Sequence, residues 1–333
     1  MQNVSGMIGI LILAILMTGS GVGRPASGAG SGSRVSGDCD RTCLNGFVDE
    51  YLKALAAHDA SRLHTTKDVK FTEDTAPLKL GDGLWQTITS VGKYRIYCDE
   101  PEAGEVGSID VIEENGMPAL MMLRLKVLGR RISEVETIVV RSQGEANEEE
   151  SAHTDKLVDP DPLWSQDVPA TSRPSRQEMI ATVNKYFDGI VTTNGKMIPF
   201  ASTGYRTLNG TADCNDAAGK GAQDFDRMPC PDQIDTGRFK YIGSITPRRF
   251  PVVDKQKGLV LALVRFNHPA TVRSIHLTDG SVLDMSKNGD GWAEHPTSAL
   301  VSELFKVEDG HIHRIWGVYT RMHYKNLVGW EGE

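Results

Sequence analysis

The sequence predicts an α+β fold that occurs twice in one chain. The segment Met121–Thr137 overlays Val301–Gly317 without a gap, 180 residues further along. Each segment alternates apolar and polar residues on both sides of a Gly-bearing turn, which is the pattern of a β-hairpin. Upstream, residues 49–52 resemble residues 184–187 inside stretches with helical periodicity. The order of helix first and hairpin last, found twice, predicts a tandem duplication of one α+β domain.

The repeat predicts which residues of the two hairpins should superpose. Lys126 should superpose on Lys306, and Ile132 on Ile312, in two separate sheets. The predicted two-residue turns are Leu128-Gly129 in the first copy and Glu308-Asp309 in the second.

Length and composition agree with two domains. The chain has 333 residues, of which 39% are hydrophobic and 24% are charged, which is enough for two cores of roughly 100 to 150 residues each. A net charge of −8 without a basic stripe argues against a nucleic-acid partner, because phosphates require clustered Lys and Arg. We expect a small-molecule ligand instead.

The N-terminus has the pattern of a targeting segment. Met7–Met17 is an apolar run of 11 residues, too short to span a bilayer of about 30 Å as a helix. Residues 1–26 therefore predict a secretory signal peptide, with an uncleaved anchor as the alternative. Residues 27–38 are Gly/Ser-rich and predict a disordered linker. We expect a secreted or periplasmic protein with no stable membrane span once the signal is removed.

Five cysteines follow the signal. An exported chain meets an oxidising compartment, which predicts a disulfide between Cys214 and Cys230 and makes Cys39 with Cys43 a second candidate pair. Cys98 is the candidate free thiol. Neither Cys-x-x-Cys nor His-Glu-x-x-His occurs, so we expect no structural zinc. The His311-x-His313 pair lacks a visible third ligand, and we predict no metal and no cofactor.

The first half, residues 39–141, begins with an amphipathic helix over 40–58. Strands are expected near 106–113, 119–127 and 132–140. Residues 142–174 are acidic and rich in proline, which predicts a linker.

The second half, residues 175–330, begins with a helix over 175–191, followed by an irregular Gly-rich insertion over 194–231. Strands are expected near 245–252, 258–267, 271–277, 300–307 and 311–321. The strand over 259–266 is apolar on both faces, so both faces must be covered. One face would meet its own helices and the other the sheet of the first copy, making an internal pseudo-dimer.

Several motifs point to a family. They are Cys39-Asp40-Arg41 with Cys43-Leu44, residues 80–85 (LGDGLW), residues 113–116 (EENG), residues 248–254 (RRFPVVD) and Asn267-His268-Pro269. Together with a long helix before an antiparallel sheet, they make the chain after residue 38 resemble the DUF8021-like family of exported bacterial and fungal proteins, within the NTF2-like or SnoaL-like superfamily. Arg206–Gly210 departs from the family pattern, because Leu208 stands where we associate an acid.

The resemblance implies a fold and a range of activities. It implies two tandem NTF2-like cone domains, each a long helix plus helices packed on a curved antiparallel sheet. The wider superfamily includes cofactor-free isomerases, dehydratases, cyclases, epoxide hydrolases and lyases, besides pure binding modules. A carboxyl group in an apolar cone suits acid/base chemistry, because its pKa moves toward neutrality.

Glu303 is the sharpest difference between the two copies. The alternating face of its strand also holds Val301, Phe305 and Val307, and Leu123 stands at the matching place in the first copy. A carboxylate there lines a pocket as an acid or base, or pairs with a cation such as Arg249 or Arg265, because an unpaired buried charge is costly.

His268 is the second catalytic candidate. It ends the two-sided apolar strand and precedes Pro269, which interrupts regular structure. A histidine at a strand mouth can act as a general base or a hydrogen-bond anchor. The alternative is a loop histidine without a catalytic role.

The predicted substrate-binding residues are two arginines and three aromatic residues. An arginine can hold a carboxylate or enolate oxygen, and aromatic rings can stack on an aromatic ligand or form core. The set is Arg249, Arg265, Tyr241, Trp316 and Tyr319.

These observations predict an exported, cofactor-independent lyase or isomerase acting on a small aromatic or polyketide-like molecule, with its main site in the second domain. The alternative is a non-catalytic small-molecule-binding or scaffold protein of the same fold.

Overall fold

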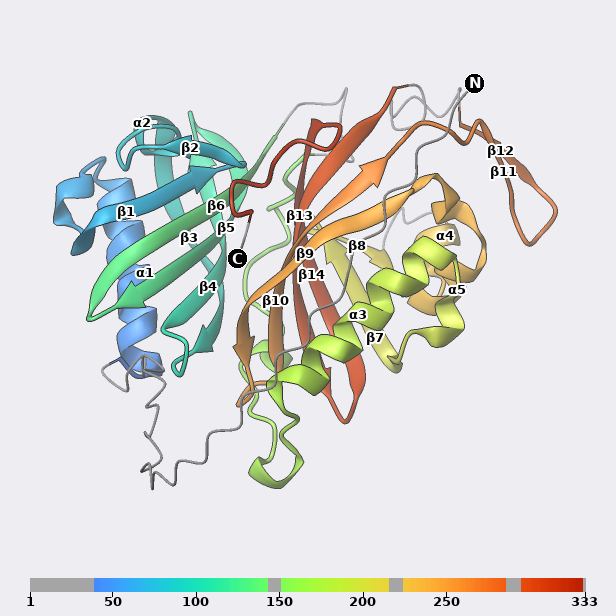
Figure 1. Cartoon of the computed structure of the whole chain (residues 1–333), viewed down its shortest axis with the longest axis horizontal. Coiled ribbons are helices and arrows are strands. Elements are labelled where there is room, and N and C mark those ends of the chain that lie inside the picture. The colour runs from blue at the N-terminus through green and yellow to red at the C-terminus, as the bar shows by residue number, and fades with distance from the viewer. Residues whose placement is uncertain (1–38, 143–150, 216–223, 286–294, 332–333) are drawn as a thin grey trace, which may run out of the picture. The chain divides into compact units, whose positions relative to one another are not determined.

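The computed structural model describes residues 39–142, 151–215, 224–285 and 295–331. The predicted signal peptide (1–26) and Gly/Ser linker (27–38) lie outside these residues. The described chain contains two six-stranded sheets, each preceded in sequence by one long helix (Figure 1). The fold class is α+β with two tandem domains of helix and sheet, as predicted. We call the core between α1 and the first sheet the first cone, and the core between α3 and the second sheet the second cone.

The first sheet follows helix α1 (Arg41–Ala56), which Asp40 caps by accepting a hydrogen bond from the Cys43 amide. Its buried face, including Leu44, Val48 and Leu55, belongs to the core of this half. The strand order is β2-β1-β6-β5-β4-β3. The elements are η1 (Ala60–Arg62), β1 (Thr65–Glu73), β2 (Ala76–Leu78), α2 (Leu84–Thr87), β3 (Ile88–Glu100), β4 (Glu105–Glu114), β5 (Met117–Leu128) and β6 (Arg131–Arg141).

The second sheet follows helix α3 (Arg176–Thr192), which begins with a reciprocal capping box between Ser175 and Glu178. The strand order is β8-β7-β14-β13-β10-β9, and β11 and β12 form a separate hairpin. The elements are η5 (Gly195–Met197), β7 (Phe200–Leu208), β8 (Thr211–Cys214), α4 (Asp224–Arg227), α5 (Cys230–Asp235), η6 (Arg238–Tyr241), β9 (Ser244–Asp254), β10 (Leu259–His268), β11 (Ser274–His276), β12 (Val282–Asp284), β13 (Thr297–Glu308) and β14 (His311–His323).

The two sheets share their register irregularities. In the β5–β6 hairpin the pairing shifts between Lys126 and Val127, and in the β13–β14 hairpin it shifts at the matching Lys306 and Val307. The amides of Val127 and Val307 both donate to a glycine carbonyl, at 2.7 Å in each case. The repeat in the sequence is therefore a repeat in the structure.

The turns of these hairpins lie one residue later than predicted. The central residues are Gly129-Arg130 and Asp309-Gly310, and all four have positive φ, between 49° and 72°. A two-residue hairpin turn of this kind needs positive φ at both central positions, which favours the Asp-Gly pair over Glu308-Asp309.

The predicted irregular insertion over 194–231 is wrong for residues 200–214. They form β7 and β8, which are the counterparts of β1 and β2, and Asn209-Gly210 closes their hairpin. β7 pairs in parallel with β14, and a pairing between segments so distant in sequence gives no hairpin signal. The strand β3 in the first half was also missed.

The two faces of β10 are covered as predicted. Val260, Ala262 and Val264 pack in one core with buried residues of α3, whereas Leu259, Leu261 and Leu263 pack in another. That second core also contains residues of the first sheet, such as Ile96, Ile109 and Leu120. The two halves thus share an apolar interface between their sheets.

The segment between the two halves is packed rather than free along its described part. It contains η3 (Pro162–Trp164) and η4 (Ala170–Ser172), and Trp164 is buried. Asp161 accepts hydrogen bonds from Tyr205 and Arg314 of the second half. Among the helices in the described ranges, none has the length and apolar character needed to cross a bilayer.

Candidate functional site

Tyr186 occupies the buried face of α3 and is the most enclosed polar side chain of that helix. Its ring makes edge contacts with Phe200 and Phe305, at centroid distances of 6.1 and 5.3 Å. Such edge-to-face contacts favour a single ring orientation. The phenol hydroxyl is therefore held toward β13.

Glu303 lies in the middle of β13, and its side chain points to the same core as α3. The Tyr186 hydroxyl donates to its Oε1 at 2.9 Å. Within the described residues, Oε2 is buried and has no hydrogen-bond partner. The residues paired with Glu303 across the sheet are small, Ala262 on β10 and Gly317 on β14, so the carboxyl group is bordered by little side-chain bulk on its own sheet.

Arg206 on β7 completes the polar group. Its Nη1 donates to the Tyr186 hydroxyl at 3.1 Å, and its Nε and Nη2 both donate to Asp213 at 2.8 Å. Nη2 also donates to Oε1 of Gln233, at 3.1 Å. The result is a connected chain from Glu303 through a phenol and a guanidinium to a second carboxylate, which we call the Glu303 network.

The environment changes the proton affinity of Glu303. Burial raises the pKa of Glu303 to about 7, and the positive charge of Arg206 and the hydrogen bond from Tyr186 act in the opposite direction. Near neutral pH both the acid and the carboxylate are then populated, which is the condition for a general acid or base.

The first cone holds apolar residues in place of Glu303 and Arg206, whereas Tyr51 corresponds to Tyr186. Leu123 matches Glu303, and both are fully buried. The pairing of Val135 with Phe71 matches that of Ile315 with Arg206, so Phe71 stands where the second cone has its guanidinium. The Glu303 network is thus specific to the second cone.

His268 does not join Glu303. It lies six residues further along the pairing of β10 with β13, opposite Thr297, which is roughly 20 Å at the rise of a strand. Its ring stacks on Tyr241 at 5.4 Å. Burial lowers the pKa of His268 to about 3, and the charge of Arg321 acts in the same direction. A neutral imidazole of such low basicity is a poor general base near neutral pH.

Tyr319 remains in the second cone. It pairs with Val301 on β13 and contacts the core that α3 covers. It is therefore a diagonal neighbour of Glu303, about 7–8 Å away by the usual spacing of such pairs.

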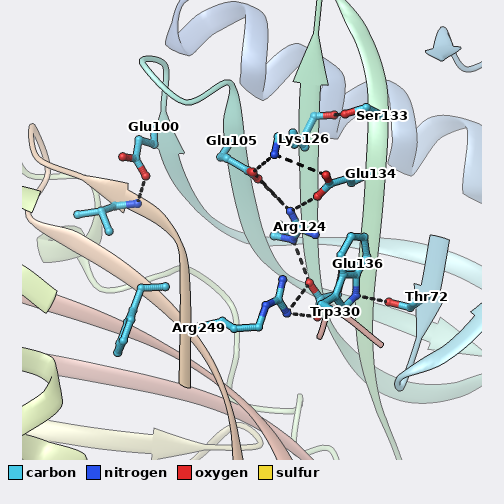
Figure 2. Close-up of polar contacts among 12 residues, drawn as sticks. Thr72, Glu100, Glu105, Arg124, Lys126, Ser133, Glu134, Glu136, Arg249 and Trp330 are labelled. Carbon is cyan, nitrogen blue, oxygen red and sulfur yellow. Dashed lines mark hydrogen bonds and ion pairs between the residues drawn. The ribbon is translucent and has the colours of Figure 1, made fainter. Parts of the chain in front are cut away.

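Arg249 does not face the second cone, contrary to the prediction. Its Nη1 donates to Glu136 of the first half at 3.0 Å, as Figure 2 shows. A bulge in β9 causes this orientation: Leu261 pairs with Val252, but Leu263 pairs with Arg249. The extra residue reverses the alternation of side chains. Arg248 faces α3 instead and donates to Asp188.

Two more predicted ligand residues face away from the cone. Arg265 donates to Asn267 and to the carbonyl of Asn326. Trp316 lies in the core between the sheets and donates to the Tyr94 hydroxyl at 2.9 Å. The alternative pairing of Glu303 with Arg249 or Arg265 is therefore wrong.

Buried polar side chains of the first half, Arg124 and Glu136 among them, lie at the same interface. Buried Arg124 donates to Glu136 and Glu134 at 2.9 and 2.8 Å, and its guanidinium lies 4.4 Å from the ring centre of Trp330 (Figure 2). The indole of Trp330 donates to Thr72. This arrangement fastens the end of the second half to the first sheet and leaves no polar group of this set in the first cone.

Two pairs of cysteines are joined. Cys39 with Cys43 and Cys214 with Cys230 lie at disulfide distance, and Cys98 is a buried free thiol. The pairs are compatible with an oxidising compartment. No group of three or more His, Cys, Asp and Glu side chains suited to a metal ion is found within the described ranges.

A family comparison finds a match over most of the second half. Residues 172–318 match the model for a domain of unknown function, DUF8021. The segment contains Tyr186, Arg206, Asp213 and Glu303, so the whole Glu303 network lies inside it. No curated protein matches the sequence.

Solved structures of similar fold cover less than half of the chain. An LEH-like epoxide hydrolase from M. tuberculosis is 9% identical, with a TM-score of 0.27, covering 44% of this chain and 86% of its own. A hexachlorocyclohexane dehydrochlorinase, LinA-type3, from Novosphingobium barchaimii is 9% identical, with a TM-score of 0.24, covering 46% of this chain and all of its own.

Sequence reasoning missed the partners of Glu303. Tyr186 enters the sequence analysis only through the similarity of residues 49–52 to residues 184–187. Asp213 falls in the predicted irregular insertion, and Gln233 lies just after it. The sequence offers one indication that the region of Arg206 is functional: Arg206 begins the segment in which Leu208 departs from the family pattern. In the structure Leu208 covers Gly317, where an added Cβ would meet it at 2.3 Å.

Proposed function

We propose that the second cone carries out cofactor-independent acid/base chemistry, as a lyase or isomerase, on a small aromatic or polyketide-like molecule. Export of the protein is part of this proposal. The observation that carries the proposal is the state of Glu303, a fully buried carboxyl group with one oxygen fixed by Tyr186 and the other without a partner among the described residues. Such a group is poised to exchange a proton with a bound molecule.

The surroundings support an aromatic or otherwise apolar ligand. Aromatic side chains packed in or against the same core include Phe187, Phe239, Phe250, Phe266 and Tyr319. Rings of this kind stack on planar ligands and exclude water. Exclusion of water keeps the pKa of the carboxyl group near neutrality.

In the reaction the carboxylate form of Glu303 would remove a proton from carbon through Oε2 and then return it as the acid. Tyr186 would keep Oε1 occupied, so that a single oxygen reacts. The guanidinium of Arg206 would balance the negative charge of the carboxylate before the first step and after the second. Between the two steps Glu303 is neutral, and the negative charge lies on the deprotonated substrate.

The direct test uses a simple ketone with exchangeable hydrogens. The full-length protein is incubated with 2-tetralone in deuterated buffer, and deuterium uptake beside the carbonyl is followed by NMR. Exchange above the buffer rate is expected for the wild type and for Leu123→Met, the matched change in the first cone. It should fall by about 10²-fold or more in Glu303→Gln, as expected on removal of a general base. Equal exchange with and without Glu303 would contradict the proposal.

A second candidate function is a non-catalytic one, as a small-molecule-binding or scaffold protein. The close packing of Leu208 against Gly317 beside Glu303 favours it, because a tightly filled wall also suits a purely structural network. In this case Glu303→Gln changes neither turnover, since there is none, nor the affinity for the ketone in calorimetry.

A further inference from the structure

The Glu303 network is anchored at its far end by two elements that a disulfide joins. Asp213 lies on β8 and Gln233 on α5, and both accept hydrogen bonds from the guanidinium of Arg206. Asp213 immediately precedes Cys214, and Gln233 follows Cys230 by one helical turn. The Cα atoms of the two cysteines are 5.0 Å apart. The disulfide therefore fixes the spacing of the two acceptors that hold Arg206.

Arg206 in turn determines the direction in which the Tyr186 hydroxyl donates its hydrogen bond. A phenol has one hydrogen to donate and an oxygen that accepts. Because Arg206 donates to that oxygen, the hydroxyl hydrogen is free to point to Oε1 of Glu303. Without the guanidinium, the hydroxyl could instead accept a hydrogen bond from neutral Glu303, and the two oxygens of the carboxyl group would no longer be distinguished.

The geometry points to Arg206 as a positioning residue that selects the reactive oxygen of Glu303, and to the Cys214–Cys230 disulfide as the element that holds Arg206 in place. This inference rests on the proposed function of Glu303. It adds a residue that does not touch the reacting atoms and a covalent link that controls it from outside the cone.

The groups that act on the proton affinity of Glu303 lie on three elements: Tyr186 of α3 through a hydrogen bond, and Arg206 of β7 and Asp213 of β8 through their charges. The adjoining strands β10 and β14 present Ala262 and Gly317, which carry no charge. A change in the proton affinity of Glu303 can therefore be traced to the Glu303 network.

The experiment measures the protonation of Glu303 itself in the unliganded, full-length protein. The carboxyl band of Glu303 is identified by infrared difference spectroscopy against Glu303→Gln and followed with pH. Arg206→Met should raise the midpoint of this titration by roughly one pH unit, because an opposite charge is removed. Arg206→Lys keeps the positive charge but loses the planar guanidinium with its several donors, and should raise the midpoint by less.

The disulfide is tested by a pair of double variants. Cys214→Ser with Cys230→Ser should shift the titration in the same direction as Arg206→Met, whereas Cys39→Ser with Cys43→Ser should leave it unchanged. Adding the first pair of substitutions to Arg206→Met should produce no further shift, because the disulfide acts through Arg206.

Two results would overturn the inference. One is an unchanged titration of Glu303 in both Arg206→Lys and Arg206→Met, when both variants retain the native circular dichroism spectrum. If Arg206→Met does not fold, the result for Arg206→Lys decides. The other is a disulfide effect of equal size with and without Arg206. Absence of ketone exchange together with the expected titration shifts would reject the proposed function and keep the positioning role.

Discussion

Replacing Glu303 by glutamine should stabilise the protein at neutral and alkaline pH relative to the wild type, and much less at acidic pH. Burial raises the pKa of Glu303 from 4.5 to about 7. Between these two values the folded chain holds a proton that the unfolded chain has released. The free energy of unfolding of the wild type therefore falls as the pH rises through this window, whereas glutamine remains neutral throughout.

The magnitude follows from the two pKa values. At 1.36 kcal/mol for each pH unit, the interval from 4.5 to about 7 corresponds to about 3 kcal/mol. This contribution is fully present below the unfolded pKa and is lost once the pH exceeds the folded one. The difference in unfolding free energy, variant minus wild type, should thus grow by about 3 kcal/mol between roughly pH 4 and pH 8.

Urea unfolding at a series of pH values, followed by tryptophan fluorescence and circular dichroism, measures this difference. Because both proteins share every other titrating group, their common pH dependence cancels. Glu50→Gln, on the exposed face of α1, is the matched control and should run parallel to the wild type. Parallel curves for Glu303→Gln would show that Glu303 ionises normally in the folded protein, and would remove the basis for acid/base chemistry there.

Three further predictions concern other parts of the molecule. Leu123→Glu, which places the same carboxyl group in the apolar first cone, should lower the unfolding free energy by several kcal/mol near neutral pH, and a loss below about 1 kcal/mol in urea unfolding would contradict the contrast between the cones. Trp330→Ala should cost about 3–5 kcal/mol, because it removes the ring that lies against Arg124; an unchanged urea midpoint would refute this fastening. The ring of His268 should not titrate between pH 5 and pH 8 in NMR spectra, because burial lowers its pKa to about 3, and a midpoint near 6.5 would place it in solvent.

The fold was largely predictable because its signals are local or repeated. The hairpins can be predicted from alternating apolar and polar residues and from their turn residues. The repeat between Met121–Thr137 and Val301–Gly317 relates two sheets that are distant in sequence, even when the strand pairing is unknown. β7 was not predictable in the same way. It joins the sheet by a parallel pairing with β14, which leaves no mark in neighbouring sequence.

The candidate site likewise contains residues that the sequence predicts and residues that it does not. Glu303 could be found by comparing the copies, since a single acid interrupts an otherwise apolar face. Arg206, which is linked to Glu303 through Tyr186, could not, because this link depends on the position of β7. Arg249 was misassigned for a different reason: one bulged residue in β9 reverses which arginine faces the helix, and alternation alone does not reveal it.

The duplication itself bears on why a buried carboxyl group is present at all. Burying Glu303, Arg206 and Tyr186 together removes polar groups from water, and replacing such sets by apolar residues is often neutral or stabilising. The first cone holds apolar Leu123 and Phe71 at the places of Glu303 and Arg206, keeps Tyr51 at the place of Tyr186, and still has a buried core. Folding therefore does not require the network. Its presence in only one of two otherwise parallel cones is better explained by a chemical task in the second cone than by stability.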